Sequence, residues 1–318
     1  MKDNTFFFEF KQTLGALKQG LGKRFLRLLG LLLLIVLPIS VVNAYTSATL
    51  AQSIFSVLPQ IDFSNPESLQ ILLNATSNSA QGGLAELLLS IIISLLQCAV
   101  YIIATVYTWQ CLGGKNDLID DSNAFVKLIL KKLPAVFLVT YFASYVLSYT
   151  LSVASMTASM FFAVPISFIA VPLAAITMFF ILSVATALVD SYASVFMASS
   201  ITGRIRFMFA MIYTRLLYRG HFFKTVVYYT LINMVAILIS AVPYAAAIYL
   251  SSIGHTAAYV VWGVASCVQC MLSGLTMCFY TARMLHLERV NESLLRPFSF
   301  VSMESQDPSD GDDGPYEQ

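Results

Sequence analysis

Apolar residues in this chain form long uninterrupted stretches separated by shorter, basic segments. No Asp, Glu, Lys or Arg occurs within residues 133–189 or 225–282. A helix needs about 20 apolar residues to cross the hydrocarbon core of a bilayer. Each of these stretches is too long for one crossing and fits two crossings joined by a tight turn. The pattern therefore predicts an all-helical, multi-pass membrane protein and excludes an ordinary water-soluble domain.

The predicted spans come in three pairs, and a basic segment precedes each pair. The turn within the second pair is expected near residues 158–165, and the turn within the third pair at the polar stretch 251–256. This order is typical of a threefold repeat. The alternative is that any loop on the inner side ends in basic residues. The predicted spans are residues 28–45, 84–109, 133–155, 165–187, 226–250 and 257–282.

Three regions follow from the same pattern. Residues 1–27 are predicted to form an amphipathic cytoplasmic helix, because apolar side chains recur at helical spacing and can lie in the membrane interface. Residues 28–290 form the six-span domain, with one long external loop at 47–83. Residues 291–318 are predicted to be an acidic, disordered cytoplasmic tail. The apolar stripe of the first region consists of Phe6, Phe10, Leu14, Leu17, Leu21 and Phe25.

The distribution of charge orients the predicted spans. The chain is 58% hydrophobic and 11% charged, with 18 basic and 17 acidic residues. All of the basic residues lie before the first span, between the second and third, between the fourth and fifth, or after the sixth. Basic loops stay in the cytoplasm, so both termini are predicted to be cytoplasmic, in the inner membrane of a bacterial cell. The near-neutral total gives no indication of a nucleic-acid partner.

The third basic segment carries candidate contact residues for the membrane surface. Its arginines lie beside apolar positions on one helical face, where long basic side chains can reach lipid phosphates. Membrane lipids are the predicted partners, and another membrane or cytoplasmic protein with an acidic surface is the alternative. The candidate contact residues are Arg204, Arg215, Arg219 and Lys224.

Few polar side chains lie within the predicted spans. Asp190, at the inner end of the fourth span, is interpreted as an interfacial residue, or alternatively as one partner of an internal ion pair with a following arginine. Asn43, Asn233 and Gln269 either join helices through hydrogen bonds or line a cavity. Because no carboxylate is expected near the middle of the membrane, ion-coupled transport is disfavoured.

The sequence carries no standard catalytic signature, such as His-Glu-x-x-His, Gly-x-Ser-x-Gly or a P-loop. The pair Cys267-x-x-Cys270 has the spacing of half a metal site, but it lies within a predicted span and no second pair completes it. We therefore expect no enzymatic activity, no catalytic residue, no metal and no cofactor.

Two short motifs resemble bacterial six-span proteins of the YciC-like family and the membrane domain attached to some glycerophosphodiester phosphodiesterases. One motif is Arg219-Gly220-His221-Phe222-Phe223-Lys224, and the other is Phe279-Tyr280-Thr281-Ala282-Arg283. The resemblance implies a helical membrane domain, often without an assigned activity. The catalytic domain of the composite proteins has no counterpart in this sequence, so their chemistry does not carry over.

Two functions remain open at this point. The first is a non-catalytic membrane scaffold, or a component of a membrane assembly, that uses its basic cytoplasmic face. The alternative is a permease for a small apolar or amphipathic solute. A continuous polar cavity between the helices would favour the permease, and a dry, packed bundle would favour the scaffold.

Overall fold

The computed structural model describes residues 6–57, 59, 83–113, 122–162, 170–202 and 210–299. Every regular element in these residues is a helix, which confirms the predicted all-helical class. A short 3-10 turn, η1 (Gly22–Arg24), joins the first two helices. The helices are α1 (Phe6–Leu21), α2 (Phe25–Val57), α4 (Gly83–Gly113), α6 (Ser122–Phe162), α7 (Ala170–Thr202), α8 (Ala210–Leu217), α9 (Phe222–Ser252), α10 (Ala257–Val290) and α11 (Glu292–Ser299).

Four helices in the described residues are long and apolar enough to cross a membrane. They are α2, residues Leu88–Leu112 of α4, α9 and α10. Helices suit this role because each satisfies its own backbone hydrogen bonds in lipid, where water is absent. The four helices are those of a multi-pass membrane protein.

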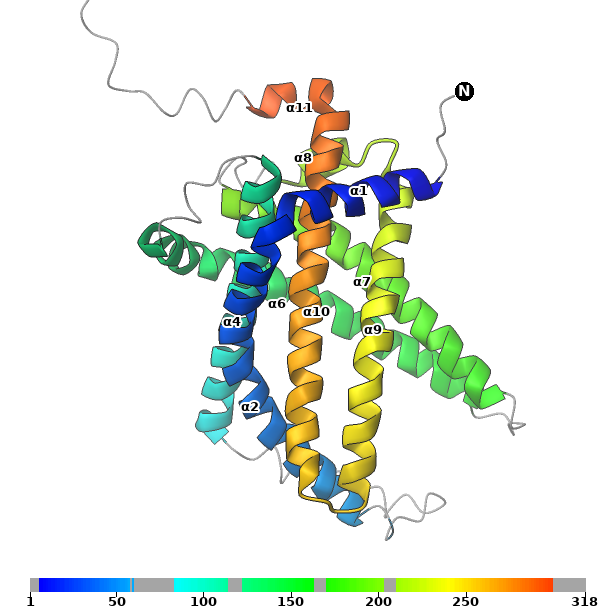
Figure 1. The fold of residues 1–318 in the computed structure, drawn as a ribbon. Coiled ribbons are helices and arrows are strands. Elements are labelled where there is room, and N and C mark those ends of the chain that lie inside the picture. Colours follow the sequence, from blue (N-terminus) through cyan, green and yellow to red (C-terminus); the bar gives the residue numbers. More distant parts are fainter. Residues whose placement is uncertain are drawn as a thin grey trace, which may run out of the picture.

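Helix α10 lies at the centre of the bundle (Figure 1) and packs against α2, α4 and α9. Helices α6 and α7 pack against each other and run obliquely to the other long helices (Figure 1). Each pair of long helices that is consecutive in the described residues is also in contact, namely α2 with α4, α4 with α6, α6 with α7, α7 with α9, and α9 with α10.

The core of the bundle is built from small and aliphatic side chains at helical spacing. Leu28, Leu32 and Val36 of α2 are fully buried, as expected for one face of a helix. Gly274 lets α10 approach this face closely. A Cβ atom at that position would lie 3.1 Å from Val100 Cγ1 and 3.2 Å from Leu32 Cδ1.

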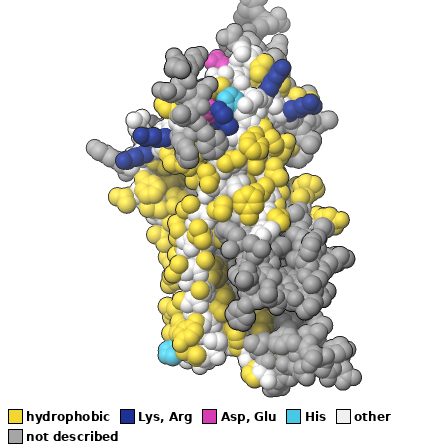
Figure 2. Space-filling model, turned by 90° about the vertical axis from the view of Figure 1, so that its right-hand side faces the viewer, with side chains coloured by type: hydrophobic (Ala, Val, Ile, Leu, Met, Phe, Trp, Pro, Cys, Tyr) yellow, Lys and Arg dark blue, Asp and Glu magenta, His cyan; other side chains and the backbone are white. Residues whose placement is uncertain are grey.

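The outer surface is apolar along the bundle and basic at one end. Figure 2 shows hydrophobic side chains along the length of the bundle and Lys and Arg side chains gathered at one end. Large exposed side chains such as Leu34, Phe142 and Val242 belong to this apolar surface, and an apolar surface of this extent fits contact with lipid. We call the end that carries α1, α8 and α11 the basic end.

Helix α1 is confirmed as a helix, but its apolar face contacts the rest of the protein. Phe10 packs against Tyr228 and Phe279, with ring centroids 5.3 and 5.6 Å apart. Gly20 lies so close to α4 that a Cβ atom there would be 2.5 Å from Leu112 Cδ2. Only part of the predicted stripe, including Leu14, remains exposed. The helix therefore lies across the basic end and against the bundle (Figure 1).

Helices are present in two regions where the sequence predicted non-helical segments. Helix α2 continues to Val57, past residue 47 where the external loop was expected to begin. Residues 292–299 form helix α11 within the tail that was expected to be disordered. The side chain of Leu295 is buried in a small apolar cluster with α8, and Asn291 Nδ2 donates a hydrogen bond to the carbonyl of Leu217 at 2.7 Å.

The two predicted turns have different outcomes. The turn between α9 and α10 falls at residues 253–256 as predicted, with Gly254 at a φ of +68°. Helix α6 remains helical to Phe162, through the first part of the turn expected at 158–165. Residues 163–169 lie outside the described residues.

Candidate functional site

A half-open cavity of about 380 Å³ lies between α4, α6, α7, α9 and α10, and polar groups occupy part of its largely apolar lining; we call it the polar cavity. Its polar lining is mostly uncharged, with hydroxyl and amide groups from each of the five helices. No lysine, arginine or histidine is among the described residues that line it. The cavity lining includes Gln97, Thr140, Ser144, Ser240, Gln269 and Ser273.

One wall of the cavity is formed by Asp190 of α7, Asn233 of α9 and Tyr280 of α10. Asn233 Nδ2 lies 3.1 Å from Asp190 Oδ2. Tyr280 Oη lies 3.0 Å from the same carboxyl oxygen and 2.6 Å from Asn233 Oδ1. Asn233 and Tyr280 are buried, at 7% and 2% exposure. The three side chains join three helices through one closed set of polar contacts, which we call the Asp190 cluster.

A second group of contacts involves side chains of α4, α9 and α10. Gln97 Nε2 donates to Tyr101 Oη at 3.3 Å and to Ser273 Oγ at 3.5 Å. The hydroxyl of Tyr244 hydrogen-bonds the side-chain oxygen of Gln269. These groups give the cavity both donors and acceptors, so the site can bind a small solute that carries polar groups.

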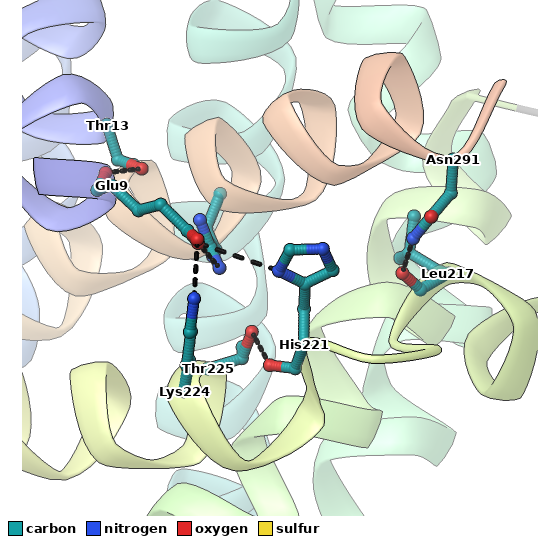
Figure 3. Close-up of polar contacts among 8 residues, drawn as sticks. Glu9, Thr13, Leu217, His221, Lys224, Thr225 and Asn291 are labelled. Atoms are coloured by element: carbon teal, nitrogen blue, oxygen red, sulfur yellow. Dashed lines mark hydrogen bonds and ion pairs between the residues drawn. The ribbon is translucent and has the colours of Figure 1, made fainter. Parts of the chain in front are cut away.

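At the basic end, a single carboxylate gathers three basic side chains (Figure 3). Glu9 of α1 accepts a hydrogen bond from Lys224 Nζ at 2.8 Å and from Arg283 NH2 at 3.0 Å. His221 Nδ1 lies 3.6 Å away. Arg283 is fully buried, and its guanidinium lies 5.0 Å from the ring centroid of Tyr228. The Glu9 cluster therefore fastens α1 to the ends of α9 and α10.

The pKa of Glu9 shows which effect dominates in this cluster. Burial by itself raises the pKa of a carboxyl group. Hydrogen bonds and charges from Lys224 and Arg283 act in the opposite direction and prevail, so the pKa of Glu9 falls from 4.5 to about 2. The Glu9 side chain is consequently ionised at neutral pH and balances part of the positive charge around it.

A separate cavity of about 680 Å³ lies at the basic end, between α7, α8 and the start of α9. Arg215 and Arg219 line it together with the aromatic rings of Tyr192 and Phe222. Tyr218 Oη donates to the carbonyl of Ser191 at 2.6 Å, which holds the α8–α9 turn on α7. We call this feature the basic groove.

The residues predicted to contact lipid therefore lie in different environments. Arg215 and Arg219 are exposed on the basic groove. Lys224 is half-buried and instead pairs with Glu9 of α1. Arg204 lies outside the described residues.

The polar residues predicted within the spans also have different roles in the structure. Asn233 and Gln269 line the cavity. Asn43 does not, because its Nδ2 donates to Ser266 Oγ at 3.0 Å and joins α2 to α10. Asp190 faces Asn233 and Tyr280 within the bundle, whereas the sequence favoured an interfacial position. Arginines 204 and 206 lie outside the described residues, so the ion pair stays a prediction.

Sequence reasoning missed the Glu9 cluster and the role of Tyr280. Glu9 directly precedes Phe10 on the inward face of α1, and an acidic residue on an otherwise apolar face was the available signal. Arg283 was assigned to the loop after the sixth span, although α10 continues to Val290 and buries it. Tyr280 lies in an aromatic run that gives no indication of a polar partner.

Comparison with protein-family models, with characterised proteins and with solved structures finds no match for this chain. The resemblance to the YciC-like family accordingly stays a prediction, and the site is interpreted from its own geometry.

Proposed function

We propose that the chain is a six-span membrane protein with both termini in the cytoplasm. Helices α6 and α7 supply the third and fourth spans, since they have 41 and 33 residues; α6 contains the predicted span 133–155, and α7 contains residues 170–187 of the predicted span 165–187. The gathering of Lys and Arg at the basic end (Figure 2) supports a cytoplasmic location for that end. The bacterial inner membrane is the proposed location.

Within this topology we propose that the protein is a permease for a small polar or amphipathic solute. The observation that carries the proposal is the polar cavity among the long helices, including three of the four membrane-spanning candidates. Polar groups cost free energy in the membrane interior unless they are paired or used. The sequence-based alternative of a fully apolar solute is disfavoured, because the cavity offers a carboxyl group, amides and hydroxyls.

The size and position of the cavity agree with this function. A volume of about 380 Å³ falls in the range of pockets that enclose small molecules. Helices α6 and α7 pack against each other and form part of the cavity wall, and α4, α9 and α10 form the rest. Movement of this pair against α4, α9 and α10 would expose the cavity to each side of the membrane in turn, as in transporters that rock one bundle against another.

The proposal is tested by solute flux in vesicles that contain the purified full chain. A panel of small polar and amphipathic solutes is compared for the wild type, Asn233→Leu and Asn43→Leu. The last variant is a matched control, because it makes the same substitution outside the cavity. We expect saturable flux that falls about tenfold in Asn233→Leu, the effect of losing about 1.4 kcal/mol of binding, and that persists in Asn43→Leu. Absence of flux for the whole panel, or equal loss in both variants, contradicts the proposal.

The basic groove supports a second candidate, the non-catalytic scaffold that engages anionic lipid or an acidic protein surface. Exposed Arg215 and Arg219 beside aromatic rings suit a phosphate headgroup at the interface. Neutralising both, together with Arg204, should lower the anionic lipid that co-purifies with the protein at low salt. An unchanged lipid content contradicts this candidate. Neither function involves catalysis.

A further inference from the structure

The Asp190 cluster requires more protons than its two neutral members can supply. Its three contacts join Asp190 Oδ2 to the Asn233 amide, Asp190 Oδ2 to Tyr280 Oη, and Tyr280 Oη to the Asn233 amide. Each contact is within hydrogen-bonding distance and needs one proton between its two atoms. The phenol of Tyr280 has one proton and can serve one contact. The Asn233 nitrogen takes part in one contact and can serve that one.

The third contact therefore needs a proton on Asp190. This conclusion does not depend on the orientation of the Asn233 amide, which is an assignment in any structure without observed hydrogens. With the Asn233 amide as placed in the structure, all three contacts are satisfied when Asp190 donates to Tyr280, Tyr280 donates to Asn233, and Asn233 donates back to Asp190. With the amide oxygen and nitrogen exchanged, Asn233 donates to Tyr280 and Tyr280 donates to Asp190. The remaining contact, between Asp190 and the Asn233 oxygen, then still needs a proton on Asp190. An ionised Asp190 would leave two oxygen lone pairs facing each other.

The surroundings of Asp190 also disfavour an unpaired negative charge. Among the described residues, the titratable groups that face it are phenols, namely Tyr101 of α4, Tyr229 of α9 and Tyr280 of α10. Helix α6 contributes Thr140 and Ser144 to the cavity and no charged residue among those described. The guanidinium of Arg283, one turn further along α10 from Tyr280, pairs with Glu9. With only these described neighbours, a carboxyl group is either protonated or paired with a cation that enters the cavity.

We propose that Asp190 is an exchange site at which a proton and a small organic cation of the ammonium class compete. The inference rests on the proposed permease and names its substrate class. When the cation binds, the O–H bond of the Asp190 carboxyl breaks, the proton leaves to water, and the carboxylate pairs with the ammonium group. The cluster and its ligand carry no net charge before or after the exchange.

The site is neutral with either the proton or the cation bound, and this favours the exchange inside a membrane. An unpaired charge in the membrane interior is costly, and both states of the site avoid it. The phenol rings of Tyr101 and Tyr280 at the cavity suit an organic cation, because aromatic faces attract ammonium groups. The volume of about 380 Å³ also exceeds what a single metal ion would need. One proton should therefore be released for each organic cation bound.

Infrared difference spectroscopy of the purified full chain at pH 5 tests the exchange. The probes are ethylammonium chloride and tetraethylammonium chloride, with sodium chloride and uncharged ethylurea as controls. We expect a band of a protonated carboxyl group that is absent in Asp190→Asn. Either organic cation should reduce it, with release of protons to an indicator dye, whereas the two controls should leave it unchanged. Glu9 contributes no such band, because its pKa of about 2 keeps it ionised.

Tyr280→Phe provides a second variant if Asp190→Asn does not fold. Removing the phenol oxygen opens the ring of contacts, so the carboxyl band should shift in frequency without addition of any cation. The proposal is overturned if the wild type lacks the band, if neither organic cation reduces it, or if sodium alone does. Solute flux in vesicles without a response of this band would refute the exchange and leave the permease standing. A responding band without flux would refute transport alone.

Discussion

Replacing Glu9 by Gln should destabilise the protein by about 3 kcal/mol at neutral pH. The pKa of Glu9 falls from 4.5 to about 2, and each pKa unit corresponds to about 1.36 kcal/mol of preference for the ionised form in the folded protein. The difference of about 2.5 units gives roughly 3.4 kcal/mol. Removing one partner of a buried ion pair costs about 3–5 kcal/mol, and Arg283 is fully buried. The two approaches agree.

The same cluster sets a dependence of stability on pH. Because the pKa of Glu9 is lower in the folded protein than in the unfolded chain, its contribution is complete above about pH 4.5 and is lost as the pH falls towards 2. The wild type should therefore lose stability across this window, and Glu9→Gln should lose less. At neutral pH the variant should also release α1 from the basic end, since Glu9 forms the polar contacts of that helix with α9 and α10.

Unfolding of the full chain in detergent measures this effect. A thiol-reactive dye reports unfolding, because Cys98, Cys270 and Cys278 are buried in the folded protein. Glu292→Gln is the matched control, since it removes an exposed carboxylate on α11. A change in the free energy of unfolding below about 0.5 kcal/mol for Glu9→Gln, the size expected of an ordinary surface substitution, would refute the reasoning.

Further predictions concern the same assay. Lys224→Met should cost about 1 kcal/mol, less than Glu9→Gln, because the lysine side chain is 31% exposed and Glu9 keeps Arg283; an equal cost for both variants would contradict this ranking. Gly274→Ala should cost about 1–3 kcal/mol through crowding against Val100 and Leu32. Gly15→Ala has no atom within 4 Å of its new Cβ and should be neutral or stabilising by up to about 1 kcal/mol, so equal effects of the two glycine substitutions would be evidence against the close approach of α10.

The sequence predicted those features that depend on long runs of one residue type. Five of the six predicted stretches lie wholly within helices, residues 170–187 of the remaining stretch lie within α7, and the polar residues 251–256 mark the turn between α9 and α10 correctly. Two of the repeated basic junctions also share a local backbone conformation. Gly22 and Gly220 lie in basic segments before α2 and α9, and both have positive φ angles, of +31° and +77°, which glycine adopts readily.

Features that depend on which faces meet could not be predicted. The helical period gives an apolar stripe on α1, but it does not show whether lipid or protein covers that stripe, and Phe10 contacts Tyr228 and Phe279. Asp190 and Asn233 are 43 positions apart, so only the packing of α7 against α9 brings them together. Asn43 and Asn233 look alike in sequence, yet one joins two helices and the other lines the cavity.

The central claim is that the cavity beside Ser240 is open to water while the outer face of the same helix contacts lipid. In a chain whose five cysteines are replaced by alanine, Ser240→Cys is compared with Leu238→Cys, whose position on α9 is 58% exposed on the apolar surface. The two variants are treated in membranes with a charged, membrane-impermeant thiol reagent. The account predicts rapid labelling of Ser240→Cys and none of Leu238→Cys. Protection of both cysteines from the reagent would contradict it.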